Sequence, residues 1–361
     1  MKVKGTTSGV KLTTLKKLRQ PGVAAALAAA VLFGASAPLS KLLLQQVGPW
    51  LLAALLYLGS GIGLWLWRRW QRAAKVHLPP GERLWLAGAI VAGGVIGPVL
   101  LLIGLSAMQA TAASLLLNAE SVFTALLAWF VFKENFDRRI ALGMASIVAG
   151  AVVLSWPSED WSASAWPALC VLGACFAWAI DNNLTRKVSL NDATFIAMVK
   201  GLVAGATNLV LAVVVGSPMP QPGMLLAAGG LGFLSYGASL ALFVVALRSL
   251  GTARTGAYFS VAPFFGAALS LLLLGEPLSG RLLVSAALMA FGVWLHLSER
   301  HAHVHHHEAL EHTHEHVHDE HHQHEHDEAV PPGTRHSHRH RHDPVTHTHE
   351  HYPDAHHRHT H

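Results

Sequence analysis

Four ionisable side chains interrupt the long apolar stretches of this sequence. Glu120 lies about ten residues into one stretch, shortly after Asn118, and Asp181 lies near the end of another and is followed by Asn182. A charged side chain at the centre of a lipid-embedded helix costs roughly 2.5 to 3.5 kcal/mol, so such residues are the first candidates for function. A carboxylate at that depth can bind a cation, or a proton in exchange for it.

Each of these residues also has a structural interpretation. Glu120 can form a helix-to-helix hydrogen bond or pair with Lys200, and Asp181 can cap a helix near water instead of forming part of a gate. Lys200 fits better as a partner of Asp181 or Glu120 than as a ligand. Lys41, near the outer end of the first apolar stretch, can snorkel to the membrane surface. The candidate polar site comprises Glu120, Asn118, Asp181, Asn182, Lys200 and Lys41.

The C-terminal tail is the second chemically distinctive region. It holds 24 of the 26 histidines within the last 61 residues, interleaved with eleven carboxylates. Such an array puts many neutral imidazoles within reach of one ion, and imidazole suits zinc, copper, nickel and iron. We expect divalent ions of this kind, such as nickel, cobalt and zinc, to bind at overlapping sites, with affinity falling below about pH 6 as imidazole protonates. The candidate metal ligands are His301, His303, His305, His306, His307, His312, His314, His316, His318, His321, His322, His324, His326, His336, His338, His340 and His342.

The tail also has other interpretations. An added purification tag would lack the interleaved acids, threonines and prolines. The sequence also fits a tether whose charge changes with pH as its histidines protonate. No hydrophobic periodicity survives after residue 300, and Pro331, Pro332 and Gly333 divide the tail in two. Such a segment cannot bury a core, so we expect it to be disordered without a ligand. No tightly bound cofactor is expected in the rest of the chain.

The elements that must position these groups are helices in a membrane. The chain has 361 residues and is 52% hydrophobic and 13% charged, whereas soluble domains carry about 25% charged residues. A helix needs roughly 20 residues to cross a hydrocarbon core of about 30 Å. The sequence therefore predicts an all-α membrane protein with ten transmembrane helices, near residues 22–45, 49–67, 84–106, 110–132, 139–156, 164–184, 193–216, 224–247, 253–274 and 280–297.

The distribution of basic residues predicts the orientation of these helices, because lysine and arginine accumulate in cytoplasmic loops. With the N-terminus inside, 18 basic residues of the N-terminal segment and the loops lie on the inner side, and the outer loops hold only Arg281. An even number of spans returns the tail to the inner side. We expect a multi-pass protein of a bacterial inner membrane with both termini cytoplasmic. The net charge of +5 reflects these topology signals and does not indicate a nucleic-acid partner.

The sequence also repeats itself. The stretch from Ser121 to Gly150 aligns without gaps at an offset of 142 with Pro263 to Gly292, so the fourth and fifth helices match the ninth and tenth. The run Ala92-Gly-Gly similarly resembles Ala228-Gly-Gly. Because each copy has five helices, the second must be inverted, which is typical of transporters with a midplane site. The predicted parts are a basic N-terminus (1–21), two five-helix repeats (22–156 and 164–298) and the tail (299–361).

These repeats resemble the drug/metabolite transporter superfamily, in particular its EamA-type members with ten helices. The resemblance covers roughly residues 22–297, and it implies helices one to four and six to nine around a central cavity, helices five and ten outside, and usually export. The first repeat departs from the family in having Ser121 where proline is common. The residues that carry the resemblance are Phe33, Gly34, Lys41, Ser121 to Glu134, Gly143, Gly150, Pro263 to Glu276 and Gly292.

The family and the tail together suggest a secondary transporter that exports nickel, cobalt or zinc, by cation/proton antiport. The alternative is an exporter of amino acids or other small metabolites whose tail only senses or buffers metal, with a cavity built on Trp178, Asn118, Tyr236 and Tyr258. A membrane-anchored metal store is a third possibility. An enzyme is not expected, because no paired nucleophile and base, phosphate loop or cofactor motif is present. A homodimer is compatible with the sequence.

Overall fold

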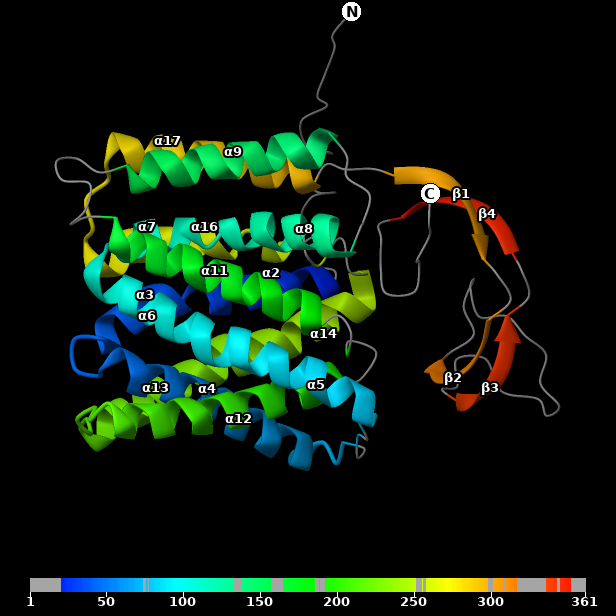
Figure 1. Cartoon of the computed structure of the whole chain (residues 1–361), viewed down its shortest axis with the longest axis horizontal. Helices are drawn as coiled ribbons and strands as arrows, with labels where there is room; N and C mark the ends of the chain where they lie inside the picture. Colours follow the sequence, from blue (N-terminus) through cyan, green and yellow to red (C-terminus); the bar gives the residue numbers. More distant parts are fainter. Residues whose placement is uncertain are drawn as a thin grey trace, which may run out of the picture. The chain divides into compact units, whose positions relative to one another are not determined.

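The computed structural model describes residues 21–73, 76, 78–132, 138–156, 165–185, 188, 192–250, 255, 258–297, 301–307, 310–316, 336–342 and 345–351. The chain divides into a helical unit up to Glu299 and a second unit, Arg300–Pro353, and each is described by itself (Figure 1).

The described part of the helical unit contains all ten expected helical segments. Seven helices are long and apolar enough to cross a membrane, and shorter apolar helices account for the fifth, ninth and tenth. In chain order they are α2 (Pro21–Gly34) with α3 (Ser36–Leu43); α4 (Pro49–Trp70); α5 (Pro80–Ala89), η1 (Ile90–Ile96) and α6 (Gly97–Ala107); α7 (Ala110–Leu116) with α8 (Ala119–Phe132); α9 (Arg138–Ser155); α11 (Trp166–Thr185); α12 (Ala193–Val214); α13 (Pro222–Gly232), η3 (Phe233–Ala238) and α14 (Ser239–Leu250); α16 (Ala262–Leu274); and α17 (Gly280–Leu297).

Local sequence explains where several of these helices begin and end. Pro49, Pro80 and Pro222 are the first residues of their helices, where the missing N–H costs nothing. Asp192 precedes α12 and accepts hydrogen bonds from two amides of its first turn. Gly275 ends α16 in the left-handed conformation, with φ of 62°, which glycine adopts without strain.

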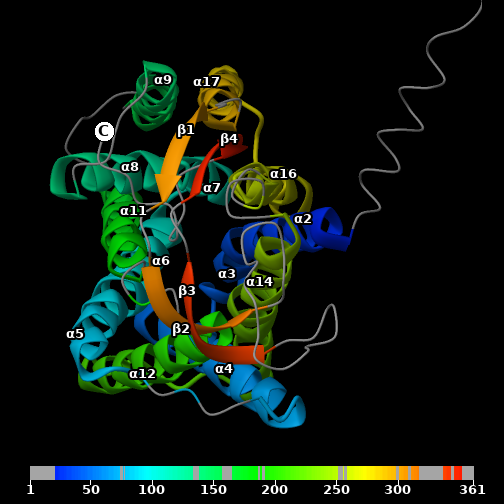
Figure 2. The ribbon, with the colours of Figure 1, turned by 90° about the vertical axis from the view of Figure 1, so that its right-hand side faces the viewer.

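The helices pack in the pattern expected of two copies related by a two-fold axis. Three helices contact their own counterparts in the other repeat: α4 packs on α12, α7 on α16, and α9 on α17. Two further contacts join non-equivalent helices in a reciprocal way. In the first, α2 of the first helix packs on α14 of the eighth, and in the second, α11, the sixth helix, packs on α6 of the third. Figure 2, which looks along the helices, shows α9 and α17 side by side outside a ring formed by the others. The placement of helices five and ten outside the ring, which the resemblance implied, is confirmed.

Both repeats interrupt their helices at matching positions. At the offset of 142, the π-helical turn η1 (Ile90–Ile96) corresponds to 232–238, and η3 occupies Phe233–Ala238. The fourth helix breaks at Leu117 and Asn118, and the ninth breaks at Ser260 and Val261. Broken helices of this kind build midplane sites in inverted-repeat transporters. The structural offset also means that Ala92-Gly-Gly and Ala228-Gly-Gly are not equivalent positions.

The break in the fourth helix does not need the proline that the ninth helix has. Pro263 stands at the start of α16. At the equivalent position, the Ser121 hydroxyl donates to the Asn118 carbonyl at 2.8 Å, and Asn118 Nδ2 donates to the Leu115 carbonyl at 2.9 Å. Side chains that bond to nearby carbonyls offer the backbone an alternative to helical bonding. Ser121 and Asn118 therefore replace proline at this break.

Burial in the helical unit matches a protein surrounded by lipid. The interior holds leucines such as Leu52, Leu56 and Leu102, which are almost completely buried, while Leu226 and Leu272 are 78% and 82% exposed on the outer surface. The ring is also tightly packed where the first and ninth helices cross, since a Cβ at Gly34 would lie 2.4 Å from the Ala262 carbonyl. Small residues at such crossings are typical of helices in membranes.

The described residues of the tail lie in short paired strands. Strands β1 (His301–His307) and β4 (Val345–His351) pair antiparallel, as do β2 (Leu310–His316) and β3 (His336–His342). The alternation of histidine with other residues in these segments has the two-residue period of a strand. Val304 and Thr348, which pair across β1 and β4, are also good strand formers.

Candidate functional site

Glu120 and Asn182 form the centre of the candidate site. Glu120 is the second residue of α8, directly after the break in the fourth helix, and Asn182 lies in the last turns of α11. Asn182 Nδ2 donates to Glu120 Oε1 at 2.7 Å and lies 3.4 Å from Thr124 Oγ1, one turn further along α8. The two helices pack along this length. Two of the predicted site residues are thus brought together, and Thr124 joins them.

The direction of Asn182 on α11 places this group inside the ring of helices. Trp166, Leu169 and Phe176 are exposed apolar residues on the outer face of α11. Successive residues turn by about 100° in an α-helix, so Asn182 lies about 120° to 160° away from those three. It is nevertheless exposed, so water can reach the interior beside Glu120. A solute within the ring would meet this amide and carboxylate.

Asp181 and Lys200 form an ion pair beside that group. Lys200 Nζ, on α12, lies 2.5 Å and 2.7 Å from the two carboxylate oxygens, and the Thr185 hydroxyl donates to Asp181 Oδ1 at 2.8 Å. Both side chains are largely buried, with 9% of Asp181 and 18% of Lys200 exposed. The backbone of η1 allows this approach, because a Cβ at Gly93 would lie 1.9 Å from Asp181 Oδ2. The sequence left the partner of Lys200 open, and the structure makes it Asp181.

The charges of this region do not balance. Lys200 neutralises Asp181, whereas the side-chain hydrogen bond described for Glu120 comes from a neutral amide. An ionised Glu120 therefore leaves the cluster with one net negative charge, in surroundings where charges interact more strongly than in water. The arrangement favours a cation, or a proton on Glu120.

Aromatic residues line the adjoining part of the ring. The Tyr57 hydroxyl and Trp178 Nε1 both donate to the Gly93 carbonyl, at 2.7 Å and 2.9 Å, so the π-helical turn η1 uses that carbonyl to hold two rings. The ring of Tyr236, in η3, lies 5.6 Å from that of Tyr57 and 5.8 Å from that of Phe33. The two π-helical turns thus each contribute to one aromatic group. Among these residues, Tyr57 was not recognised from the sequence.

Two of the predicted site residues lie elsewhere. Lys41 Nζ donates to the carbonyls of Leu105, Ser106 and Met108, at 2.7, 3.1 and 2.9 Å, and so caps the C-terminus of α6. Asn118 is buried at the helix break, and its Nδ2 lies 4.0 Å from the sulfur atom Sδ of Met289 on α17. Neither side chain contacts Glu120 among the hydrogen bonds described. Tyr258, the other residue expected in a metabolite cavity, packs near Ala25 and Ala246.

Glu276 has a role that its place in the repeat did not reveal. Its carboxylate accepts from the amides of Ala110 and Thr111, at 2.7 and 2.8 Å, and from the Thr111 hydroxyl. These are the free amides at the start of α7, which Glu276 caps from the connection between α16 and α17. Lys41 and Glu276 therefore hold the two sides of the turn between α6 and α7. A glutamate directly after Gly275 was the only sequence signal.

A second ion pair fixes the start of α12. Arg68 Nη1 donates to Asp192 Oδ2 at 2.7 Å and to Thr194 Oγ1 at 2.5 Å. Burial alone would raise the pKa of the Asp192 carboxyl, but hydrogen bonds from Thr194, Arg68 and Phe195 outweigh burial and hold that pKa below its ordinary value. The pair ties the end of α4 to the start of α12 and lies apart from the polar centre.

The backbone register of the tail pairs histidine with histidine. His301, His303 and His305 lie opposite His351, His349 and His347, and His312, His314 and His316 lie opposite His340, His338 and His336. The predicted ligands His318, His321, His322, His324 and His326 lie outside the described residues. Among the residues that the structure describes, no group of three or more histidine, cysteine, aspartate or glutamate side chains lies close enough together to hold a metal ion.

Comparisons with known proteins place this geometry in a family. The sequence profile of the EamA-like transporter family matches residues 20–156 and again residues 165–298. An uncharacterized transporter of Methanothermobacter thermautotrophicus is 30% identical over an alignment of 293 residues that covers 76% of this chain and 85% of the relative. A protein of Salmonella typhimurium named as a probable amino-acid metabolite efflux pump is 28% identical over an alignment of 207 residues that covers 53% of this chain and 68% of the relative.

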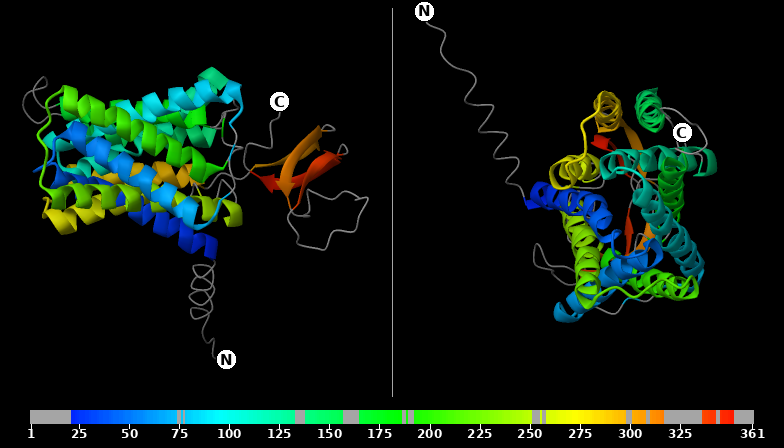
Figure 3. Two further views of the ribbon diagram at one scale, coloured as in Figure 1. Left: turned by 90° about the horizontal axis from the view of Figure 1, so that it is seen from below. Right: turned by 90° about the vertical axis from the view of Figure 1, so that its left-hand side faces the viewer.

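A solved crystal structure has a similar fold. It matches with a TM-score of 0.58 at 18% identity, over 77% of this chain and 96% of the other. The end-on view in Figure 3 shows the arrangement of helices to which this similarity applies.

Proposed function

Because the chain belongs to the EamA-like transporter family, we propose that it exports a divalent transition-metal cation, nickel, cobalt or zinc, in exchange for protons. The observation that carries this proposal is the uncompensated carboxylate of Glu120, held by Asn182 beside an Asp181 that Lys200 already neutralises. A site with one net negative charge attracts a cation and loses it when the carboxylate is protonated.

The oxygen atoms near Glu120 suit a transient cation site. Glu120 and Thr124 supply a carboxylate and a hydroxyl oxygen one turn apart on α8, and the Asn182 amide donates to that carboxylate from α11. A cation held there keeps part of its water shell, since so few protein ligands are present. Weak, partly hydrated binding is what a transport site needs, because the ion must leave on the other side. Protonation of Glu120 from the outer side would promote that release.

The tail is proposed to collect the ion. Its six cross-strand pairs of histidines bring imidazole-bearing residues into register along two short sheets. Imidazole is a favoured ligand of nickel, cobalt and zinc. A tethered set of such sites raises the local concentration of the ion near the transporter. This role requires the tail on the cytoplasmic side of a bacterial inner membrane, in agreement with the distribution of basic residues.

Flux in proteoliposomes tests the proposal. Nickel, cobalt and zinc are loaded separately, a proton gradient is imposed, and ion movement is compared for the wild type, Glu120→Gln and a form ending at residue 300. Glu120→Gln should abolish proton-driven flux, because the amide cannot exchange a proton. Glu82→Gln makes the same change outside the polar centre and should transport normally. Deletion of the tail should slow flux only at low ion concentration.

The result that would refute metal export is a wild type that moves none of the three ions. A Glu120→Gln variant that moves them with an unchanged response to the proton gradient would refute the role of that carboxylate. A wild type that binds metal without moving it would instead make the chain a metal store.

A second candidate is export of an amino acid or another small metabolite. The specific observation in its favour is the aromatic group formed by Phe33, Tyr57 and Tyr236 next to the polar centre. One relative is also named for amino-acid metabolite efflux. Tyr236→Ala should then impair export of metabolites and leave metal flux unchanged, which separates the two candidates. In this case the tail senses or buffers metal.

A further inference from the structure

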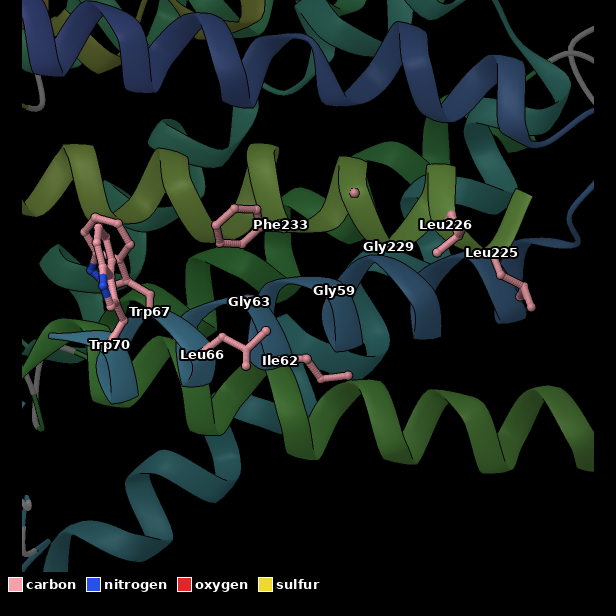
Figure 4. Close-up of a pocket in the computed structure, with 11 residues that line it drawn as sticks. Gly59, Ile62, Gly63, Leu66, Trp67, Trp70, Leu225, Leu226, Gly229 and Phe233 are labelled. Carbon is pink, nitrogen blue, oxygen red and sulfur yellow. The ribbon is translucent and has the colours of Figure 1, made fainter. Parts of the chain in front are cut away.

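An apolar groove lies between α4 and the helix formed by α13 and η3. Its volume is about 570 Å³, and it runs from Gly59 to Trp70 on α4 and from Leu225 to Phe233 on the other side (Figure 4). Every residue that lines it is glycine, leucine, isoleucine, tryptophan or phenylalanine. We refer to it as the α4–α13 groove. It plays no part in the polar centre described above.

Glycines give the groove its depth. A Cβ at Gly59 would lie 2.1 Å from the Gly229 carbonyl oxygen, and one at Gly63 would lie 2.0 Å from the Phe233 ring, so these two glycines let the helices approach. Gly229 and Gly230 differ, since a Cβ at either meets nothing within 4 Å. These positions are open because of missing side chains, and a larger residue there would fill the groove without disturbing the packing.

The groove covers most of the depth of a hydrocarbon core. Trp70 is the last residue of α4, and Trp67 and Trp70 stand at the interfacial end of the groove, as tryptophans do at membrane interfaces. On the other helix the lining begins at Leu225, four residues before Gly229, which lies opposite Gly59. The groove therefore covers about 15 residues of helix, roughly 22 Å of a hydrocarbon core of about 30 Å, a depth that suits an extended acyl chain.

The charge at the interfacial end selects among lipids. Arg69 and Arg72 are exposed at this end of the helix, and the Arg69 guanidinium lies 5.6 Å from the centre of the Trp65 ring. Arginines just outside the hydrocarbon attract anionic headgroups. We propose that the α4–α13 groove binds one acyl chain of an anionic phospholipid, whose headgroup contacts Arg69 and Arg72.

A second copy of the chain fits this face less well. Two copies inserted in the same sense and related by a two-fold axis would bring Arg69 and Arg72 of one subunit toward the same residues of the other. Like charges would then oppose the contact. The wall residue Phe233 belongs to η3, which also carries Tyr236 of the aromatic group, so bound lipid supports the helix turn that holds that tyrosine.

Native mass spectrometry of the full chain in detergent tests the proposal, with phosphatidylglycerol and phosphatidylcholine added in turn. The wild type should retain one phosphatidylglycerol in preference to phosphatidylcholine. Gly230→Leu should lose the adduct, because leucine fills the groove. Gly223→Leu makes the same change on α13 outside the groove, also at a position with open space, and should bind as the wild type does.

The headgroup contact has its own variant. Arg69→Gln with Arg72→Gln changes two exposed residues outside the groove, so it tests the proposal even where Gly230→Leu does not fold. Loss of two cations next to an anionic headgroup should reduce the preference for phosphatidylglycerol roughly thirtyfold. Equal binding by the wild type and Gly230→Leu would overturn the proposal. So would a dimer that Gly230→Leu dissociates without any change in bound lipid, since the occupant would then be a second copy.

Discussion

Replacing Asp181 by asparagine should destabilise the helical unit more than replacing Asp181 and Lys200 together. The single change leaves the Lys200 ammonium, which is 18% exposed, without its carboxylate. Removing one partner of a buried ion pair costs about 3 to 5 kcal/mol. Lys200 keeps the Thr185 hydroxyl at 3.2 Å, and an asparagine oxygen can still accept a hydrogen bond. We therefore expect a loss of about 3 kcal/mol, at the lower end of that range.

The double variant Asp181→Asn with Lys200→Met removes both charges. Neutral replacement of a buried pair is often nearly without cost, so the double variant should recover about 2 kcal/mol relative to Asp181→Asn. That difference corresponds to roughly thirtyfold in the unfolding equilibrium. Unfolding by dodecyl sulfate in mixed micelles, followed by circular dichroism, measures it. A double variant as unstable as Asp181→Asn would refute the reasoning, because the cost would then come from packing and not from a stranded charge.

Three further predictions concern the ends and crossings of helices. The stability that the Asp192 carboxylate contributes is complete above about pH 3.9, the ordinary pKa of an aspartate, and is lost as pH falls through the lower pKa of the folded state. Hydrogen exchange of the amides in the first turn of α12 should therefore accelerate at low pH. Asp192→Asn should remove this pH dependence. Gly34→Ala should cost about 1 to 3 kcal/mol in micelle unfolding because of overpacking, whereas Gly81→Ala, whose Cβ meets nothing within 4 Å, should cost nothing. Glu276→Ala should lower stability by about 1 to 2 kcal/mol by removing the cap of α7, whereas Glu276→Gln, which keeps one acceptor, should lose less.

Much of the fold and part of the site could be predicted from the sequence. The length of each apolar stretch fixes how many helices can cross a bilayer, so the ten segments appear at their expected places. The offset of 142 between the halves aligned Ser121 with Pro263, and the structure places a helix break shortly before each of them. Glu120 and Asp181 were also identifiable, because a carboxylate in an apolar run is costly wherever it lies.

Only the tertiary structure decided which of these polar groups meet. Lys200 pairs with Asp181 and not with Glu120, and Lys41 bonds to carbonyls at the end of α6. A sequence gives the depth of a side chain in its own helix, but the neighbour it contacts depends on how each helix is rotated and which helix packs beside it. The same reason hid Glu276, whose partners lie about 165 residues away. In the tail, the two-residue alternation was present in the sequence, and the pairing of its strands set which histidines lie opposite each other.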